Sequence, residues 1–261
     1  HVDVGTKARF FDETDWNPKD LAGLDILEVG CGAGRFSEVI LNHTKANLYS
    51  VDYSNAVDAN FKTNGSNPRL KLFQASIYEL PFPKQSFDKV FCFGVLQHTP
   101  DFQKSIECLA QMVKPGGELI VDFYPIKGWY TKINAKYLLR PFLKKMDHEK
   151  LLALAERNVD WMLKLSKFFV EIGVDRYTNR FIPVCDLKQA TPHALTGKEL
   201  RDWAVLNTFD MFSPEYDNPQ KISTVTQWFM EAGLSVTFAD MITYGTDGHQ
   251  APVIRGIRKA K

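Results

Sequence analysis

Apolar stretches and amphipathic stretches alternate through the first half of the chain. The apolar stretches are long enough for a strand and too short for a helix, and turn-forming residues bound them. Each therefore predicts a strand that is buried in a sheet. The predicted strands are residues 24–29, 47–51, 69–75, 87–93 and 118–123.

The stretches between these strands predict helices. Residues 35–42 carry apolar side chains at helical spacing. Ser54 suits the N-cap of a helix that ends near residue 63, and Asp101 suits the N-cap of a helix that ends near residue 113. The Lys-Pro-Gly-Gly sequence at 114–117 predicts a turn before the fifth strand. Strands and helices that alternate with short connections predict a parallel, doubly wound sheet.

The alternation stops after Pro125 and resumes near residue 218. The intervening pattern is helical or irregular, with helices expected at 130–142 and 149–172. A helix is then expected at 222–232, closed by Gly233, followed by strands at 235–239 and 253–257 with a short loop between them. This ending suits a terminal antiparallel hairpin.

The predicted fold is therefore of the α/β class, with a Rossmann-like, doubly wound seven-stranded sheet that ends in an antiparallel hairpin. Residues 1–125 and 218–261 form the predicted core domain. Residues 126–217 form a mainly helical insertion after the fifth strand.

The loop after the first strand is the most distinctive local motif. Its sequence is ILEVGCGAGR at 26–35, in which Gly30, Gly32 and Gly34 alternate with other residues. Glycine has no β-carbon, so a ligand can approach the backbone closely at these positions. The layout is typical of a nucleotide-binding loop at the first strand-to-helix turn of an α/β sheet. Glycines alone do not distinguish a nicotinamide dinucleotide from another nucleoside cofactor.

Four further features favour a cofactor other than nicotinamide. The glycines are spaced GxGxG rather than GxGxxG, and Glu28 lies on the strand two residues before Gly30. The third strand leads into the sequence QASIYELPF at 74–82. The chain ends with a helix and two strands joined by a short loop.

With these motifs the chain resembles the class I S-adenosylmethionine-dependent methyltransferases, and most closely the branch that acts on small molecules. The resemblance covers most of residues 20–124, and the terminal helix and hairpin fit the same order of elements. The matching segments are LEVGCGAGRF (27–36), VDYS (51–54), QASIYELPFPKQSFDKVFCFGVLQHTPD (74–101) and VKPGGELIVDFY (113–124). The resemblance implies S-adenosyl-L-methionine as the cofactor and S-adenosyl-L-homocysteine as the product, with a small-molecule acceptor methylated at oxygen, nitrogen or carbon.

The resemblance implies a role for each residue of the motifs. Asp52 is expected to accept hydrogen bonds from both ribose hydroxyls. Ser76 and Ile77 fall where the family holds adenine, Tyr53 is a second candidate to cover that ring, and Glu28 is expected near the methionine end. The full set of expected cofactor-binding residues is Glu28, Gly30, Cys31, Gly32, Gly34, Arg35, Asp52, Tyr53, Ser54, Ser76, Ile77, Gly94 and Gln97.

Three of these residues have alternative structural roles. Asp52 could be a helix-capping acid before Ser54, and Glu28 could be a strand-end acid that bonds the amides of the loop. Ile77 could belong to the core. These alternatives stay open at the level of the sequence.

Gly94, Gln97 and His98 follow the fourth strand, over the edge where open α/β sheets bind ligands. Family members offer a backbone carbonyl to the amino group of the cofactor at the position of Gly94. His98 lies where the transferable methyl group is expected, so it is a candidate general base. Its alternative role is to cap the turn at Asp101 or to shape the cofactor pocket. The expected reaction is an in-line displacement that releases a neutral thioether, and it requires alignment rather than a metal.

The insertion is expected to be a lid that recognises the acceptor. Residues 126–181 contain twelve Lys or Arg and six Asp or Glu, which favours an anionic acceptor or, alternatively, a solvated basic helix face. The segment 207–217 is expected to be a loop that returns the chain to the sheet. The candidate acceptor contacts are Tyr124, Tyr130, Asp210 and Tyr216.

The composition restricts the expected partners and location of the protein. The net charge of +1 does not favour a nucleic-acid partner, and no apolar run reaches the roughly 18 residues of a membrane span. The four cysteines include no CxxC pair, and no signal peptide is visible, which together predict reduced thiols and a cytoplasmic location. Two other functions remain as alternatives: a nicotinamide-dependent oxidoreductase, and a catalytically silent module that binds a cofactor or a partner.

Overall fold

The structure is a computed structural model that describes residues 4–126, 128, 131, 133–174, 179–182, 195–244 and 249–259. Its contacts divide the chain into two compact units. Residues 1–126 and 216–261 form the sheet unit, and residues 127–215 form the helical unit.

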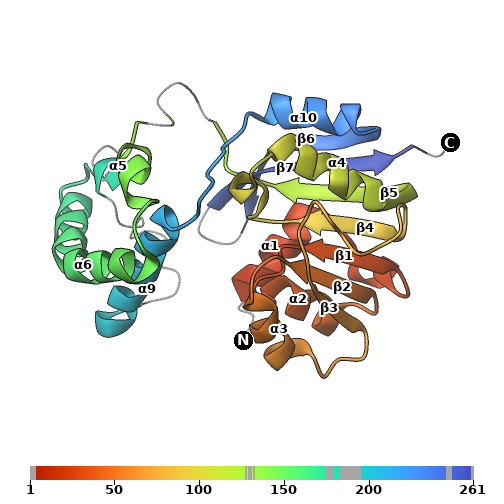
Figure 1. Cartoon of the computed structure of the whole chain (residues 1–261), viewed down its shortest axis with the longest axis horizontal. Helices are drawn as coiled ribbons and strands as arrows, with labels where there is room; N and C mark the ends of the chain where they lie inside the picture. Colours follow the sequence, from red (N-terminus) through yellow and green to blue (C-terminus); the bar gives the residue numbers. More distant parts are fainter. Residues whose placement is uncertain are drawn as a thin grey trace. The chain divides into compact units, whose positions relative to one another are not determined.

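The sheet unit is built on a seven-stranded sheet with the strand order β3-β2-β1-β4-β5-β7-β6 (Figure 1). The strands are β1 (Asp25–Val29), β2 (Asn47–Asp52), β3 (Leu70–Gln74), β4 (Phe87–Cys92), β5 (Val113–Asp122), β6 (Leu234–Tyr244) and β7 (His249–Arg258). The first five strands pair in parallel, and β7 is antiparallel to both β5 and β6. The predicted α/β class and the terminal antiparallel hairpin are confirmed.

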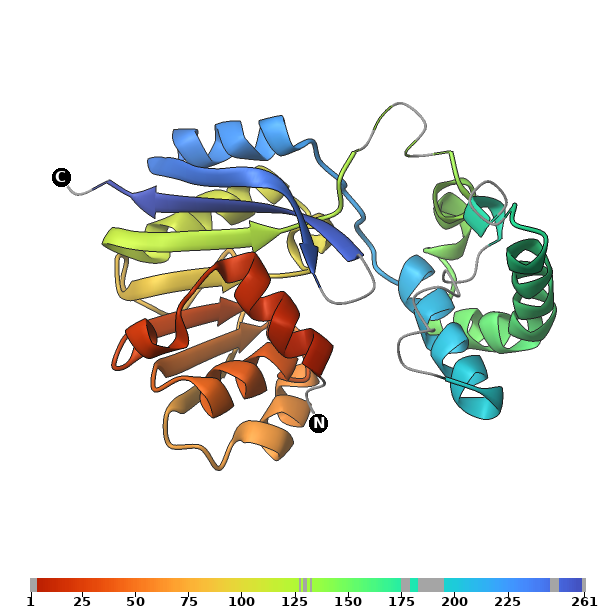
Figure 2. The same ribbon diagram turned by 180° about the vertical axis from the view of Figure 1, so that it is seen from behind.

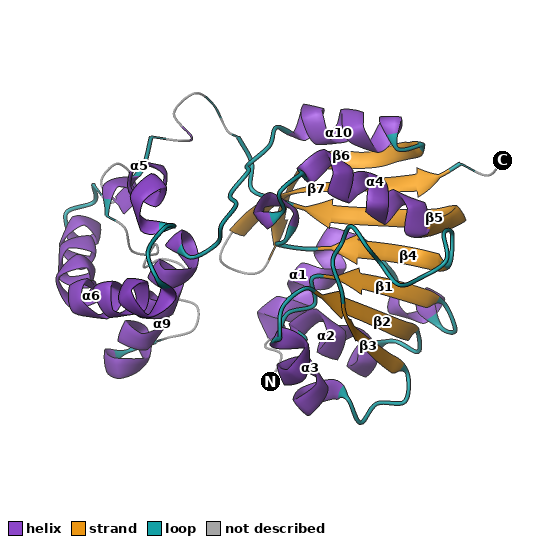
Figure 3. Ribbon diagram, viewed as in Figure 1, coloured by secondary structure: helices purple, strands orange, loops and turns teal. Residues whose placement is uncertain are grey.

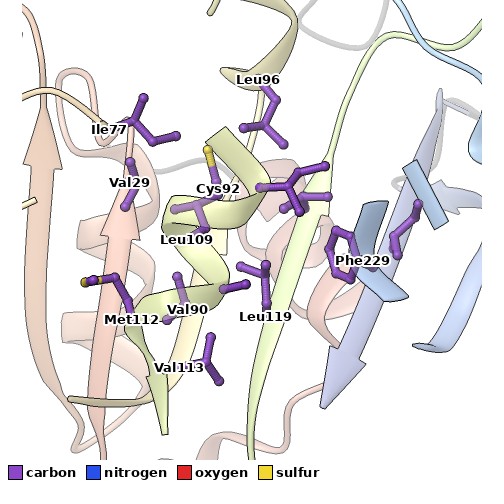
Figure 4. Packing of buried hydrophobic residues seen from close by; sticks show 14 of the residues in the cluster. Val29, Ile77, Val90, Cys92, Leu96, Leu109, Met112, Val113, Leu119 and Phe229 are labelled. Atoms are coloured by element: carbon purple, nitrogen blue, oxygen red, sulfur yellow. The ribbon is translucent and has the colours of Figure 1, made fainter. Parts of the chain in front are cut away.

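Helices cover both faces of this sheet (Figures 2 and 3). The helices of the sheet unit are α1 (Val4–Thr14), α2 (Arg35–His43), α3 (Ala56–Asn64), α4 (Phe102–Met112) and α10 (Ile222–Glu231), with short 3-10 helices η1 (Pro18–Leu21) and η2 (Leu96–His98). Because side chains of a strand alternate between its faces, Ile26 packs with residues of α1 and α2, whereas Leu27 and Val29 pack with residues of α4 and α10. Figure 4 shows the second of these cores, where Leu109 of α4 and Phe229 of α10 meet the strand residues.

The helical unit contains α5 (Ala135–Leu143), α6 (His148–Glu171) and α9 (Gly197–Phe212), with the short helix η4 (Asn179–Phe181). Its small core gathers apolar side chains of α6 and α9 around Val159 and Ala204, which are fully buried. None of the described helices, in either unit, is long and apolar enough to cross a membrane.

Several predicted boundaries of the sheet unit were wrong. Helix α1 was not predicted at all. Helix α3 begins at Ala56 with Asn55 as its N-cap, so Ser54 does not cap it. The predicted turn at 114–117 lies inside β5, where Phe87 pairs with Val113 and Lys89 with Glu118, so the extra residues bulge out of the ladder. Strands β6 and β7 extend well beyond the predicted 235–239 and 253–257, because both contain polar residues along their length and β6 is only partly buried.

The helical unit departs from the prediction at two places. Helix α5 begins at Ala135 rather than at residue 130, because the side chain of Asn134 caps it by accepting from the backbone N–H of Tyr137. Residues 207–212, predicted as a loop, form the last turns of α9. The aromatic and acidic residues of that segment are spaced along a helix that was not recognised.

Candidate functional site

The candidate site lies at the carboxyl ends of the parallel strands. Strand β1 pairs with β2 on one side and with β4 on the other. The strands β2 and β3 are thus added on one side of β1 and the later strands on its other side, so the strand order reverses at β1. A parallel sheet binds ligands at such a reversal point, in the crevice outside its strand ends. The loops after β1, β2 and β4 carry most of the residues that the sequence singled out.

The glycines of the loop after β1 serve different purposes. A β-carbon on Gly30 would lie 2.1 Å from the Cγ2 atom of Val95, and one on Gly34 would lie 2.2 Å from the Oδ1 atom of Asn60. These two glycines are required by the packing of the protein itself. A β-carbon on Gly32 would meet no atom within 4 Å, and the same holds for Gly94. Gly32 and Gly94 therefore leave open space where a ligand can approach the backbone.

Asp52 connects the end of β2 to this loop. Its Oδ2 atom accepts a hydrogen bond from the backbone N–H of Gly32 at 2.7 Å. Its Oδ1 atom accepts from both the backbone N–H and the hydroxyl of Ser54, at 2.9 and 2.7 Å. Since α3 has Asn55 as its N-cap, Asp52 forms the turn before that helix and does not cap it. The carboxylate is thereby held in one orientation beside the open face of Gly32.

Glu28 lies beneath the loop and is almost completely buried. Its Oε2 atom accepts from the hydroxyls of Ser37 and Ser50 at 2.5 and 2.6 Å, and Ser37 in turn accepts from the amide of Asn60. The Oε1 atom has no hydrogen-bond partner among the described residues. Burial, with a smaller contribution from the charge of Asp52, raises the pKa of Glu28 to about 7 against the opposing effect of the two serine hydrogen bonds. Among the described residues Glu28 thus bonds hydroxyls and not the amides of the loop.

The expected adenine-binding residues lie after β2 and β3. Ile77 is buried and belongs to the core that faces α4 and α10, as its alternative role proposed. Tyr53 is 79% exposed, so its ring is available to a ligand. The hydroxyl of Ser76 accepts from the backbone N–H of Tyr78 at 3.2 Å.

Asp122, at the end of β5, is a site residue that the sequence analysis missed. Its carboxylate accepts from the backbone N–H of Gly94 and is paired with the guanidinium of Arg9 on α1. Arg9 also pairs with Glu13, whose side chain is fully buried. Burial raises the pKa of Asp122, and it raises the pKa of Glu13 to about 8. The available signal was position alone: Asp122 is the first polar residue after the apolar run of the fifth strand.

Two arginines lie near this buried acid. The guanidinium of Arg35 stacks over the ring of Phe36 at 4.5 Å, and Arg9 lies 5.4 Å from the same ring. Burial and the charge of Arg9 both lower the pKa of Arg35. The sequence offered no motif for Arg9, because α1 itself was not predicted.

Cys31, the remaining loop residue of the predicted set, is buried. Burial raises the pKa of its thiol to about 12. The thiol of Cys31 is therefore neutral near pH 7.

Gln97 and His98 lie on the short helix η2 that follows Gly94. The side-chain amide of Gln97 is fully buried, and neither its nitrogen nor its oxygen has a hydrogen-bond partner among the described residues. Buried polar groups are almost always paired, so this amide is a candidate ligand contact.

His98 is fixed by the segment that enters α10. Its Nδ1 atom lies 3.0 Å from the backbone carbonyl of Tyr216. A carbonyl can only accept, so Nδ1 carries the proton of the neutral ring and the lone pair is on Nε2. The ring of Tyr124 meets the His98 ring edge to face, with centroids 5.6 Å apart. The structure thus brings His98, Tyr124 and Tyr216 together.

Two further candidate acceptor contacts belong to the 126–217 segment. Asp210 is an exposed residue of α9 in the helical unit. Tyr130 lies outside the described residues. No cluster of three potential metal ligands occurs among the residues that the structure describes.

A cavity of about 550 Å³ lies elsewhere, beside Lys89 of β4 and Glu118 of β5. Four of its charged lining residues form two ion pairs: Lys89 bonds Glu118 at 2.8 Å, and Arg255 bonds Asp15 at 3.0 Å. It contains none of the predicted site residues.

Comparisons with known proteins match the part of the chain that contains these loops. The family described as "Methyltransferase domain" matches residues 27–121, which include the loops after β1, β2 and β4. A ubiquinone biosynthesis O-methyltransferase of Coxiella burnetii is 33% identical over 134 residues, which are 49% of this chain and 56% of that protein. A tRNA U34 carboxymethyltransferase of Nautilia profundicola is 30% identical over 111 residues, 42% of this chain and 37% of that protein.

Among solved structures, magnesium protoporphyrin IX methyltransferase from Synechocystis PCC 6803 with bound S-adenosylhomocysteine superposes with a TM-score of 0.52. The match covers 99% of this chain and 85% of that chain at 14% identity, which shows the fold alone. The chain spans about half the length of the curated relatives that it matches.

Proposed function

Because the chain belongs to the class I S-adenosylmethionine-dependent methyltransferases, as its motifs predicted, we propose that it transfers the methyl group of S-adenosyl-L-methionine to a small-molecule acceptor. The observation that carries the proposal is the open backbone at Gly32 and Gly94, on either side of the point where the strand order reverses. Two loops that leave such space at one sheet edge suit a nucleoside cofactor.

The residues present fit this cofactor. Asp52 would accept the ribose hydroxyls with the lone pairs that remain on its fixed carboxylate. Tyr53, Ser76 and Ile77 remain the proposed contacts of adenine. The amide of Gln97, which has no partner among the described residues, and the guanidinium of Arg35 would bind the polar amino-acid end. Glu28 and Asp122 would support the loop and the backbone of Gly94 from beneath.

The cofactor supplies an electrophilic methyl group and leaves as a neutral thioether. The protein is required to align the acceptor with that methyl group and to exclude water. Tyr124, Tyr216 and His98 are the proposed acceptor contacts of the sheet unit. Tyr130, Asp210 and the anionic character of the acceptor remain predictions about the 126–217 insertion, which we propose as the lid and acceptor-binding part.

His98 has two candidate roles. The Nδ1–H tautomer would place a basic lone pair on Nε2, which suits a general base. The bond to Tyr216 would equally suit a residue that shapes the pocket. Replacing His98 with alanine separates the roles: a loss of turnover with unchanged cofactor affinity assigns the base, and a parallel loss of cofactor binding assigns the pocket.

A small-molecule acceptor is supported by the names of relatives that act on ubiquinone precursors, whereas the relative named for tRNA makes RNA the competing acceptor. The net charge of +1 supports the small molecule, because RNA-binding domains are usually basic.

The experiment supplies S-adenosylmethionine labelled at the methyl group together with a fractionated metabolite extract or total tRNA. The expected result is label on a metabolite other than S-adenosylmethionine, and the absence of that labelled product with an Asp52→Ala variant. Label found in tRNA alone would show that the acceptor is RNA and not a small molecule. If NAD or NADP, and not S-adenosylhomocysteine, stabilised the protein in a thermal shift assay, the cofactor would be a nicotinamide dinucleotide.

A further inference from the structure

The helical unit contains a cavity of about 230 Å³ between α5, α6 and α9. Its walls are almost entirely apolar side chains. They include Leu139 and Leu143 of α5, Leu151 and Met162 of α6, and Phe212 of α9. The cavity opens past Leu139, Leu154 and Trp161, which are 40%, 37% and 51% exposed.

Two polar side chains in the wall, those of Asn158 and Trp161, already have hydrogen-bond partners. The amide nitrogen of Asn158 donates to the carbonyl of Leu154 at 2.8 Å, and its oxygen accepts from the indole of Trp161 at 2.9 Å. These groups therefore close one side of the cavity without requiring a ligand.

Thr208 of α9 differs from them. It lines the same cavity and is 4% exposed, and its hydroxyl has no hydrogen-bond partner among the described residues. A buried hydroxyl without a partner is costly, and native proteins rarely leave one in an apolar wall. The cavity thus combines apolar walls with a single unmet polar group.

We propose that this cavity is a binding site for an apolar small molecule, or apolar part of one, that carries one hydrogen-bonding group for Thr208. An apolar cavity of about 150 Å³ holds benzene, so 230 Å³ holds about nine carbon atoms by proportion. A charged ligand is disfavoured, because none of the described residues that line the cavity carries a charge to pair with it. The chemical class is a short alkyl or alkylphenyl group that ends in a hydroxyl or a carbonyl.

The described residues of the cavity wall all belong to the helical unit, and none of them is among the proposed contacts of the cofactor or the acceptor. The proposal therefore stands or fails independently of the proposed function.

The test uses the whole chain and two probes that differ by one hydroxyl, 4-propylphenol and propylbenzene. Calorimetry is expected to show saturable binding of both, with a Kd for 4-propylphenol below about 1 mM. Thr208→Val keeps the shape of the side chain and removes its hydroxyl. It is expected to weaken 4-propylphenol by about threefold to tenfold and to leave propylbenzene unchanged.

Two neighbouring residues of α5 provide a matched pair. Leu139→Trp fills the mouth of the cavity and is expected to weaken both probes at least about tenfold. Leu138→Trp adds the same group at a position that is 57% exposed and does not line the cavity, and it is expected to bind both probes normally. If Leu139→Trp does not fold, Ala155→Leu narrows the cavity from within and is tested in its place.

Three results would overturn the proposal. The first is the absence of saturable binding of either probe to the wild-type chain. The second is equal binding by the Leu139→Trp and Leu138→Trp variants. The third is a wild-type dimer that Leu139→Trp alone dissociates, since the cavity would then be part of a contact between two copies of the chain.

Discussion

The sheet unit and the helical unit differ in the buried polar atoms that they leave without partners. In the sheet unit such atoms include the Oε1 atom of Glu28, near the end of β1, and the side-chain amide of Gln97, on the short helix after β4. In the described part of the helical unit, the hydroxyl of Thr208 is such an atom, in an apolar wall. The first pattern suits a polar, charged cofactor, and the second suits an apolar ligand with one polar group.

The two units also differ in what fixes their sites. The loop after β1 depends on backbone conformation at particular glycines, whereas the cavity of the helical unit is a gap between side chains of three helices. A backbone requirement restricts residue type at one position, so it leaves a motif. A gap between side chains can be formed by many combinations of apolar residues, so it leaves none.

The largest effect is expected within the glycine loop. Gly30→Ala brings a β-carbon against Val95 at a backbone φ of +84°, which should lower the free energy of unfolding by roughly 2–5 kcal/mol. Gly32→Ala has a φ of +51° but open space, so it should lower that free energy by only about 1–2 kcal/mol while it blocks cofactor binding. Chemical denaturation of both variants measures the difference. Equal destabilisation would contradict the distinction between a packing glycine and a ligand glycine.

The next effect concerns pH. The pKa of Glu28 is about 7 in the folded chain, raised by burial from its ordinary value of 4.5. The folded state therefore retains a proton that the unfolded state has lost, and the free energy of unfolding falls as pH rises from about 4.5 to about 7. The loss due to Glu28 is at most about 3 kcal/mol.

Glu28→Gln imitates the protonated side chain and should remove this part of the pH dependence. Urea denaturation between pH 4 and pH 8 measures it. A residual slope that continues toward pH 8 is expected, because the pKa of Glu13 is about 8. An unchanged slope below pH 7 in the variant would show that Glu28 is already ionised in the folded protein.

A smaller effect compares one buried threonine from each unit. Thr208→Val removes a hydroxyl without a partner and should raise the free energy of unfolding by about 1 kcal/mol. Thr44→Val removes a buried hydroxyl that donates to the carbonyl of Ile40 at 2.8 Å, and it should lower that free energy by about the same amount. Thermal denaturation of the two variants decides the comparison, and a loss of stability in both would contradict it.

The parts of the molecule that the sequence predicted share a physical property. Strands β1, β2 and β4 each contain buried apolar side chains that mark them as strands, and the glycine loop and Asp52 follow directly from their ends. The hairpin strands β6 and β7 were predicted, but with bounds that were too short, because both strands mix polar and apolar residues.

The parts that were missed depend on contacts between residues far apart in the chain. The pairing of Arg9 with Asp122 joins residues 113 positions apart, and neither residue belongs to a local motif. Helix α9 lacks a strongly amphipathic pattern, so Asp210 was assigned to a loop. The separation of the three glycines into packing and ligand roles required the positions of Val95 and Asn60.

The central claim is that the carboxyl edge of the sheet unit binds S-adenosylmethionine through Asp52. Calorimetric titration with S-adenosylhomocysteine tests it most directly, with Asp52→Ala and the exposed α3 residue Asp58→Ala as matched variants. The account predicts a loss of affinity of about 10-fold to 100-fold for Asp52→Ala, from roughly 1.5–3 kcal/mol for a charged hydrogen bond, and none for Asp58→Ala. Equal affinity of the wild-type chain and Asp52→Ala would contradict it.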